Sequence, residues 1–399
     1  MTVRVNKQPF NIREKLSELE RPIGVKGNEL MRAETAQEAG ALLGVGRKNM
    51  IINGNQDIDQ RNDGSATADF TGSGQFVTDR WEGYNGNGGT ISGQRVDDAP
   101  PGFKRSLKVT VGTAAASRAA NAYAGMYYTV EGFDAYRFAW GTSGAKYATI
   151  SFWVKSSVAG LYTVAVRDNA FMSYYTATYY IDSINTWEYK TVTIPPTTSG
   201  SFSATNGLAF SLFFGLDIGS NAQGTVNSWR IGAGNYYATS GMAPLFATSG
   251  NTWQITGVQM EVGKNATEFE HRSYGEEFTL CQRYYQSYGL ETDRSAQGPF
   301  RIVWSSNGAA NNALTGFMFP TPMRTYPSVT SYGSGTAGGN FRVYTGTNYA
   351  TVSSIASVTR SDRSMRLNYS LGVGAGDAAG WIDVGDANYH HAFTLDAEL

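Results

Sequence analysis

Apolar side chains recur at every second position in several segments of the middle of the chain. The clearest are residues 150–154, 162–166 and 208–216, which read Ile-Ser-Phe-Trp-Val, Tyr-Thr-Val-Ala-Val and Leu-Ala-Phe-Ser-Leu-Phe-Phe-Gly-Leu. A period of two predicts strands with one buried face. Turns rich in Gly, Ser, Asn and Thr separate these strands, and we therefore expect a two-sheet sandwich over residues 47–272.

Shorter alternating segments follow in the last part of the chain, at residues 300–304, 314–319, 341–344, 365–369 and 381–384. They predict a smaller C-terminal β-sandwich domain over residues 290–399. Short strands would leave sheet edges exposed, and copies of the same chain could cover these edges. The fold class expected for the whole chain is therefore mainly β.

Between the two β regions, the period changes. Trp253 and Ile255 are out of phase by one position with Val258 and Met260, and the shift at Gly257 predicts a β-bulge. After it, Ser273 and the glutamate three positions later form a capping box, followed by apolar residues at helical spacing. Residues 273–289 are therefore expected to form a linker helix between the two β domains.

The first 46 residues predict helices. Ile12, Leu16 and Leu19 form one apolar stripe, and a second helical pattern over residues 28–43 contains Leu30. Short helices with so little apolar surface are marginal when isolated in water. We expect residues 1–46 to dock, either on their own β domain, on sister copies or on a larger assembly.

Charge and cysteine usage exclude several classes of partner. The formal net charge is −1, which argues against nucleic acid as a partner, and no apolar run approaches the ~18 residues of a membrane span, which argues against membrane insertion. The one cysteine, Cys281, excludes an intrachain disulfide framework and is expected to be a buried structural thiol.

Candidate catalytic and metal-binding patterns are weak. There are three histidines, and the carboxylate pairs at 97–98 and 276–277 are adjacent in sequence, so their side chains point in different directions. Asp57, Asp59 and Asp63 crowd a turn at Gly64 that could hold calcium, but Arg61 between them favours a solvated turn. We expect no metal, no cofactor and no enzymatic activity.

Aromatic residues favour recognition. The chain has 24 tyrosines and 8 tryptophans, more than the core requires, and flat rings suit contact with sugars. Trp153 lies on the strand face opposite Phe152 and its apolar neighbours, and Tyr175 belongs to an adjacent pair that places one ring on each face. Both are candidates for glycan contact, with sheet packing or a subunit interface as the alternative.

Three strings resemble those of bacteriophage tail-fibre proteins. Residues 252–285 resemble the junction that closes a jelly-roll domain in that family, from Ile-Thr-Gly-Val-Gln-Met-Glu-Val-Gly to the run ending Cys-Gln-Arg-Tyr-Tyr. Residues 48–55 are similar to the opening strand of the same domain, and residues 76–81, Phe-Val-Thr-Asp-Arg-Trp, to its next signature. Asp59 stands where relatives carry an aromatic residue, so a contact made by that ring is not carried over.

The resemblance implies a homotrimeric, virion-located tail fibre. Its N-terminus, including Ile12, Leu16, Leu19 and Leu30, would attach to a tail component such as an adaptor, hub or baseplate. The jelly roll would be similar to carbohydrate-binding modules, and the distal domain would meet a host cell-surface glycan or protein.

Because loops on a rigid scaffold carry function, we expect receptor contact beside Tyr332, Tyr344 and Tyr349. The alternatives are a purely structural spike or connector, and a polysaccharide depolymerase. The latter is disfavoured because the chain lacks long β-helical repeats.

Overall fold

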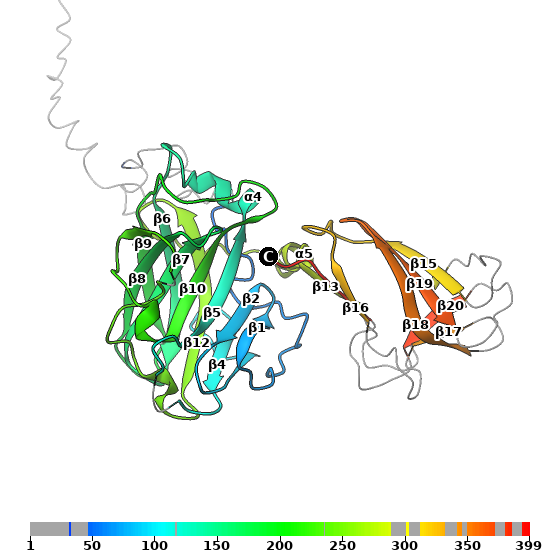
Figure 1. The fold of residues 1–399 in the computed structure, drawn as a ribbon, viewed down its shortest axis with the longest axis horizontal. Coiled ribbons are helices and arrows are strands. Elements are labelled where there is room, and N and C mark those ends of the chain that lie inside the picture. The colour runs from blue at the N-terminus through cyan, green and yellow to red at the C-terminus, as the bar shows by residue number, and fades with distance from the viewer. Residues whose placement is uncertain are drawn as a thin grey trace, which may run out of the picture.

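The computed structural model describes residue 32 and residues 47–115, 118–234, 236–288, 301–302, 312–331, 341–344, 349–371, 380–384 and 393–399. The predictions for Ile12, Leu16, Leu19 and Leu30 lie outside these residues. The described residues are mainly β, with few helices and several antiparallel sheets (Figure 1). In that form the expected fold class is confirmed.

The largest sheet has seven strands in the order β1-β2-β5-β10-β7-β8-β11. Their bounds are Gly72–Thr78 for β1, Trp81–Asn85 for β2, Tyr123–Glu131 for β5, Gly160–Asp168 for β7, Ser173–Ile181 for β8, Leu208–Ile218 for β10 and Trp229–Ile231 for β11. Neighbouring strands are antiparallel.

A five-stranded sheet, in the order β3-β4-β12-β6-β9, packs face to face with the first (Figure 1). Its strands are Ile91–Val96 for β3, Ser106–Val111 for β4, Ala148–Ser156 for β6, Glu188–Ile194 for β9 and Thr252–Val262 for β12. Side chains from both inner faces share one buried core, in which Phe152 of β6 lies edge-on to Phe214 of β10 at 5.3 Å between ring centroids. The alternating segments read from the sequence supply this core.

Strand β12 carries the predicted bulge. The pairing of β12 with β6 shifts register between Thr256 and Gln259, and Gly257 has a φ of 61°. A side chain at Gly257 would start 2.6 Å from the ring of Phe103, so that both the backbone conformation and the space demand glycine.

One half of the predicted capping box is present, and the Glu276 carboxylate is paired with Arg47. Helix α5 spans Tyr274–Gln282, and the Ser273 hydroxyl accepts a hydrogen bond from the Glu276 backbone N–H at 3.3 Å. The other helices among the described residues are short: α4 (Gly132–Ala135), η1 (Tyr136–Phe138), η2 (Ser220–Ala222) and η3 (Leu245–Ala247). No helix in the described ranges is long and apolar enough to span a bilayer.

Two further sheets follow α5 (Figure 1). A three-stranded sheet orders β13 (Tyr285–Tyr288), β21 (Phe393–Asp396) and β16 (Ser328–Ser331). The expected linker segment therefore carries a strand as well as a helix. A six-stranded sheet follows the order β14-β20-β17-β18-β19-β15, with bounds Arg301–Ile302, Gly380–Val384, Phe341–Tyr344, Tyr349–Arg360, Ser364–Leu371 and Asn312–Met318 in that order.

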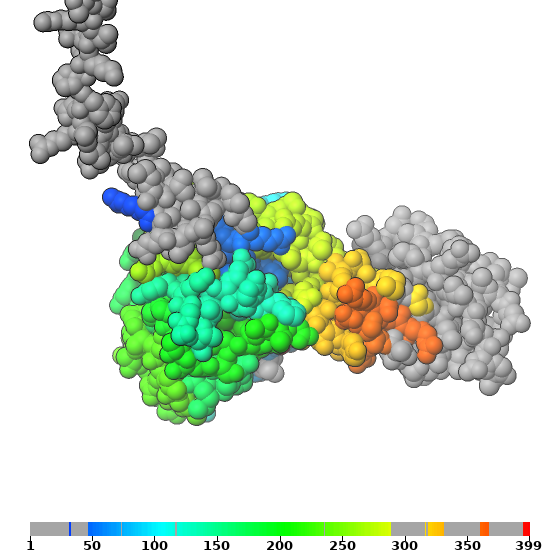
Figure 2. Space-filling view, turned by 90° about the horizontal axis from the view of Figure 1, so that it is seen from above, coloured from blue at the N-terminus to red at the C-terminus, as the bar shows by residue number. Residues whose placement is uncertain are grey.

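The last residue of the chain packs where α5 meets the start of the sandwich domain. Cys281 and Tyr284 are fully buried in a small cluster with Ile52 and Ile58, against which Leu399 packs. The predicted burial of the Cys281 thiol is confirmed, and burial raises its pKa well above the usual range. Figure 2 shows the described residues before β16, in yellow-orange, beside the sandwich, where the Asn206 side chain donates to the Arg324 carbonyl at 3.0 Å.

Candidate functional site

The outer face of the seven-stranded sheet carries an aromatic surface. On β5, Met126 and Tyr128 point into the core between the sheets, so the alternating residues Tyr123 and Tyr127 point outward. On β10, Phe213 is outward and pairs with Tyr127 in the ladder. We call the outward set on this sheet the aromatic face.

The rings of the aromatic face lie close together. Tyr84 of β2 stacks on Tyr123 with centroids 4.5 Å apart and planes at 11°. Tyr127 lies 4.4 Å from Phe213, which in turn lies 4.6 Å from Tyr237. Because Tyr84, Tyr123 and Tyr127 remain half-buried, parts of their rings are open to solvent.

A short stretch of chain covers the middle of the face. This cover segment, residues 236–242, places Tyr237 and Met242 over the outward side chains of β7 and β8. Two threonines hold it down: Thr163 donates its hydroxyl to the Tyr237 carbonyl at 2.8 Å, and Thr176 donates to the Tyr236 carbonyl at 2.6 Å. The cover segment thereby separates a buried aromatic floor from an accessible margin around Tyr84 and Tyr123.

Hydroxyl groups and one guanidinium supply polarity to the face. Tyr127 donates to the Tyr237 hydroxyl oxygen at 3.1 Å, and that oxygen also accepts from Arg167. Burial raises the pKa of Tyr174 to about 12 and raises the pKa of Tyr127 and Tyr123 above their usual range. These phenols therefore stay protonated at neutral pH and can still donate hydrogen bonds.

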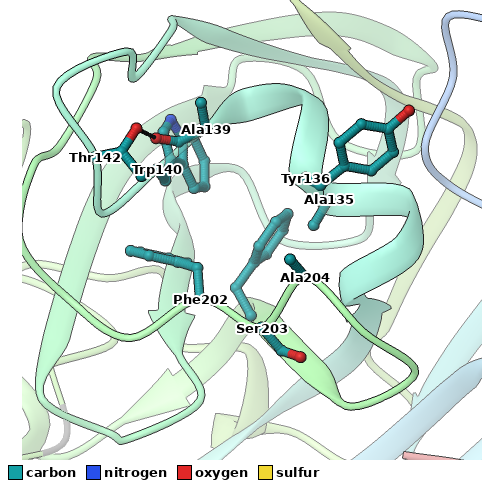
Figure 3. A pocket seen from close by; sticks show the side chains of 9 residues that line it. Ala135, Tyr136, Ala139, Trp140, Thr142, Phe202, Ser203 and Ala204 are labelled. Atoms are coloured by element: carbon teal, nitrogen blue, oxygen red, sulfur yellow. Dashed lines mark hydrogen bonds between the residues drawn. The ribbon is translucent and has the colours of Figure 1, made fainter.

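A separate hollow of about 200 Å³ lies beside α4 and η1 (Figure 3). The rings of Tyr136, Trp140, Phe202 and Phe210 line it, and Tyr136 is 62% exposed. Two of its polar groups are bonded within the chain. The Trp140 indole N–H donates to the Lys146 carbonyl at 2.8 Å. The Thr142 hydroxyl donates to the Ala139 carbonyl at 2.6 Å (Figure 3). The hollow therefore offers apolar contact but little to orient a polar ligand.

The structure separates the two predicted aromatic candidates of the sandwich. Trp153 lies outward on the five-stranded sheet, half-buried, with its ring 5.4 Å from that of Tyr189. Tyr175 is only 4% exposed and packs in the core against Trp229 at 5.5 Å. Its neighbour Tyr174 is the ring that points to the outer face. The Tyr175 ring thus supports sheet packing and presents no open face to a ligand.

The distal candidates are placed in part. Tyr344 ends β17 and Tyr349 begins β18, and their backbones pair across the loop that joins the two strands. Tyr332 lies outside the described residues, as do the side chains of Tyr344 and Tyr349.

The aspartate turn is explained by its own hydrogen bonds. One carboxylate oxygen of Asp59 accepts from the Asn62 backbone N–H at 3.0 Å and the other from Gly64 at 2.8 Å, which closes the turn. Within the described ranges, no three His, Cys, Asp or Glu side chains gather in a way that could hold a metal ion.

Tyr84, Tyr123, Tyr127 and Arg167 were not singled out from the sequence. The sequence pattern that could have identified them is on β5, where Tyr123 and Tyr127 alternate with core residues, so that both faces of the strand are apolar. A strand that is aromatic on both faces indicates a covered or ligand-facing outer side.

Comparisons with known proteins show resemblance of shape alone. No family model and no curated protein matches the chain. Among solved structures, the enzymatically active domain of tailspike protein 4 of bacteriophage CBA120 aligns at 14% identity and a TM-score of 0.29, covering 54% of this chain and 21% of that one. The chain thus spans about a fifth of the length of that tailspike structure.

Two other solved structures are carbohydrate-binding modules. The family 11 module of a cellulosomal cellulase of Clostridium thermocellum aligns at 14% identity and a TM-score of 0.26, covering 51% of this chain and all of that one. The CBM22-1–CBM22-2 tandem domain of Xyn10C from Paenibacillus barcinonensis aligns at 11% identity and a TM-score of 0.25, covering 84% of this chain and 96% of that one. At these TM-scores the alignments carry no conclusion about function.

Proposed function

We propose that this protein is a bacteriophage tail-fibre component that recognises a glycan on the host cell surface. The observation that carries glycan recognition is the aromatic face, with the stacked rings of Tyr84 and Tyr123 at its open margin. The tail-fibre assignment is supported by the strings at residues 48–55, 76–81 and 252–285.

The chemistry of the face suits a sugar. The flat rings offer apolar surface to the C–H groups of a pyranose, and the phenolic hydroxyls offer hydrogen bonds at the ring edges. Arg167 adds a fixed cation within the same surface. Rings, hydroxyls and a guanidinium bind and orient a saccharide, and we therefore propose binding and not catalysis.

Assembly would strengthen such a site. In a homotrimer attached to the tail through residues 1–46, three copies of a weak site could engage one cell together, with avidity gains of ~10² to 10⁴ where geometry permits. The distal loops beside Tyr332, Tyr344 and Tyr349 remain a second candidate contact, supported by their position between strands of the C-terminal part. A structural spike without a receptor site and a depolymerase remain the alternatives.

The test is retention of the purified full chain on immobilised surface polysaccharides of bacteria, with and without periodate oxidation of the sugars. We expect retention that periodate abolishes, and at least tenfold weaker retention for Tyr84→Ala. Tyr84→Phe keeps the ring and should retain most of the binding. Tyr326→Ala removes a 66% exposed tyrosine elsewhere and should change nothing.

The possible outcomes separate the alternatives. If Tyr136→Ala loses retention and Tyr84→Ala keeps it, the glycan site lies in the hollow beside α4. If Trp153→Ala loses retention, the glycan site lies on the five-stranded sheet. No retention on any polysaccharide would favour the structural spike, and release of shortened sugar chains during incubation would favour the depolymerase.

A further inference from the structure

One row of outward side chains crosses the seven-stranded sheet beside the aromatic face. The ladders pair Ser211 of β10 with Arg167 of β7, Arg167 with Tyr174 of β8, and Tyr174 with Arg230 of β11. Paired residues lie on the same face of a sheet, so that two arginines flank one buried tyrosine. We call Arg167, Tyr174 and Arg230 the arginine row.

Arg167 is held by aromatic rings and not by a carboxylate. Its guanidinium carbon lies 4.0 Å from the centroid of the Phe171 ring and 5.4 Å from that of Tyr127. Phe171 is 46% exposed and has a φ of 58°, which is uncommon for a residue with a side chain. Arg167 Nε and the hydroxyl of Ser211 are both buried without a hydrogen-bond partner among the described residues.

Arg230 repeats this arrangement at the sheet edge. Its guanidinium carbon lies 3.6 Å from the centroid of the Tyr236 ring, and its side chain is exposed. Within the described part of the chain, no Asp or Glu oxygen lies within 4.0 Å of Arg167 or Arg230. Arg80, in the turn between β1 and β2, is in contrast paired with Glu398.

We infer that the arginine row binds a carboxylate-bearing polysaccharide, with one sugar carboxylate at Arg167 and a second at Arg230. This inference rests on the proposed glycan recognition and specifies its ligand class. Charge complementarity carries it, because two cations fixed on aromatic rings have no anionic partner within the described chain. Arginine pairs with planar carboxylates through two parallel N–H bonds.

The spacing and approach favour a chain of acidic sugars. Arg167 and Arg230 are two strands apart, about 10 Å, so that carboxylates on nearby units of one polymer can reach both. Phe171 and Tyr236 lie against the guanidinium groups of Arg167 and Arg230. Arg167 Nη1 donates to the Tyr237 hydroxyl and Arg167 Nε is buried, so a sugar carboxylate would meet Nη2 there, whereas the exposed Arg230 can offer it two N–H groups. A guanidinium group also binds phosphates through two N–H bonds, so a phosphodiester-linked polymer belongs among the ligands tested.

The experiment measures retention of the full chain on matched immobilised polymers. The acidic member is polygalacturonate, its neutral partner is the fully methyl-esterified polymer, and a panel of other uronic-acid polysaccharides and a phosphodiester-linked teichoic acid complete the set. We expect retention on uronic-acid polymers that weakens as salt is raised, and no retention on the esterified polymer.

Two charge-removing variants and one control locate the contact. Arg230→Gln should weaken retention about tenfold, and Arg167→Gln at least as much. Arg363→Gln removes the same charge from an arginine whose side chain is 69% exposed and should leave retention unchanged. Because Arg167→Gln also removes a bond to Tyr237, the exposed Arg230→Gln is the decisive variant if Arg167→Gln fails to fold.

The results separate this inference from the proposed function. Retention on neutral polymers, lost in Tyr84→Ala but unchanged in Arg230→Gln, would overturn the acidic ligand and keep glycan recognition. Retention on the teichoic acid alone would overturn the carboxylate in favour of phosphate. Retention on no polymer would overturn both proposals.

Discussion

Arg80 and Glu398 form a buried ion pair between residues 318 positions apart in the sequence. Their side chains are 1% and 7% exposed, and the Arg80 guanidinium carbon lies 3.6 Å from the centroid of the Tyr284 ring. Glu398 also accepts from Arg61 at 3.4 Å. The pair therefore ties the C-terminal residues to both the sandwich and the segment that follows α5.

Glu398→Ala should destabilise the protein by about 3 to 5 kcal/mol, because Arg80 would remain buried without its anion. The measurement is the free energy of unfolding from guanidinium denaturation, followed by tyrosine and tryptophan fluorescence. Asp362→Ala is the matched control, since it breaks an ion pair with Arg363 that is exposed and 3.8 Å long, and should cost less than ~1 kcal/mol. Equal losses in the two variants would contradict the buried pair.

Asp79 should make stability depend on pH. Its side chain is buried, and burial raises the pKa of the carboxyl to about 6 from 3.8, although Arg61 opposes the rise. Since the folded state holds the proton more tightly than the unfolded state, stability from this group is greatest below pH 3.8 and is lost as pH rises to about 6.

Asp79→Asn removes this dependence and keeps one oxygen to accept from the Gln60 backbone N–H, which donates to Asp79 at 2.9 Å, but it loses the oxygen that accepts from the Gln60 side chain. As pH rises from 4 to 6, the free energy of unfolding of the variant should rise relative to that of wild type by about 2 to 3 kcal/mol. Urea midpoints at several pH values give the comparison. Parallel curves for the two proteins would show that Asp79 has no raised pKa.

Much of the sandwich could be predicted because its strands are amphipathic. The alternation around Phe152 fixes which side chains enter the core, and it also places Trp153 outward as observed. The bulge at Gly257 and the cap at Ser273 are local, and local sequence is sufficient to predict them.

The aromatic face could not be read in the same way. Tyr123 and Tyr127 alternate with Met126 and Tyr128, so β5 is apolar on both faces and its pattern does not tell the outer face from the core. The distinction depends on the cover segment, which is distant in sequence and has no strand or helix period. For the same reason, an adjacent pair such as Tyr174 and Tyr175 does not reveal which ring is enclosed.

Gly257→Ala should destabilise the sandwich by about 1 to 3 kcal/mol, since φ is positive there and Phe103 must move. Gly275→Ala is a control of the same chemistry with the opposite expected sign. Gly275 lies in α5 with nothing near its added methyl group, and alanine there should stabilise by about 0.5 to 1 kcal/mol. The measurement is the melting temperature of both variants. A Gly257→Ala protein that melts at the wild-type temperature would contradict the bulge.

The purified chain should be a trimer of about three times 43.2 kDa. The physical reason is that short sheets in the C-terminal part, such as the three-stranded sheet of β13, β21 and β16, have edges that other copies can cover. Light scattering over a dilution series measures the mass. A folded, soluble monomer at micromolar concentration would contradict the trimer.

Replacing Tyr332 and Tyr349 together with alanine tests the distal loops. If these loops meet the receptor first, attachment of labelled protein to cells of the strain that the phage infects should weaken while the trimer and its melting temperature stay nearly unchanged, because surface substitutions usually alter stability by less than ~0.5 kcal/mol. Tyr326→Ala, on an exposed tyrosine between β15 and β16, is the control and should attach normally. Normal attachment of the double variant, together with loss in Tyr84→Ala, would place receptor contact on the sandwich alone. Loss of attachment in both variants would mean that two surfaces of one fibre contact the receptor.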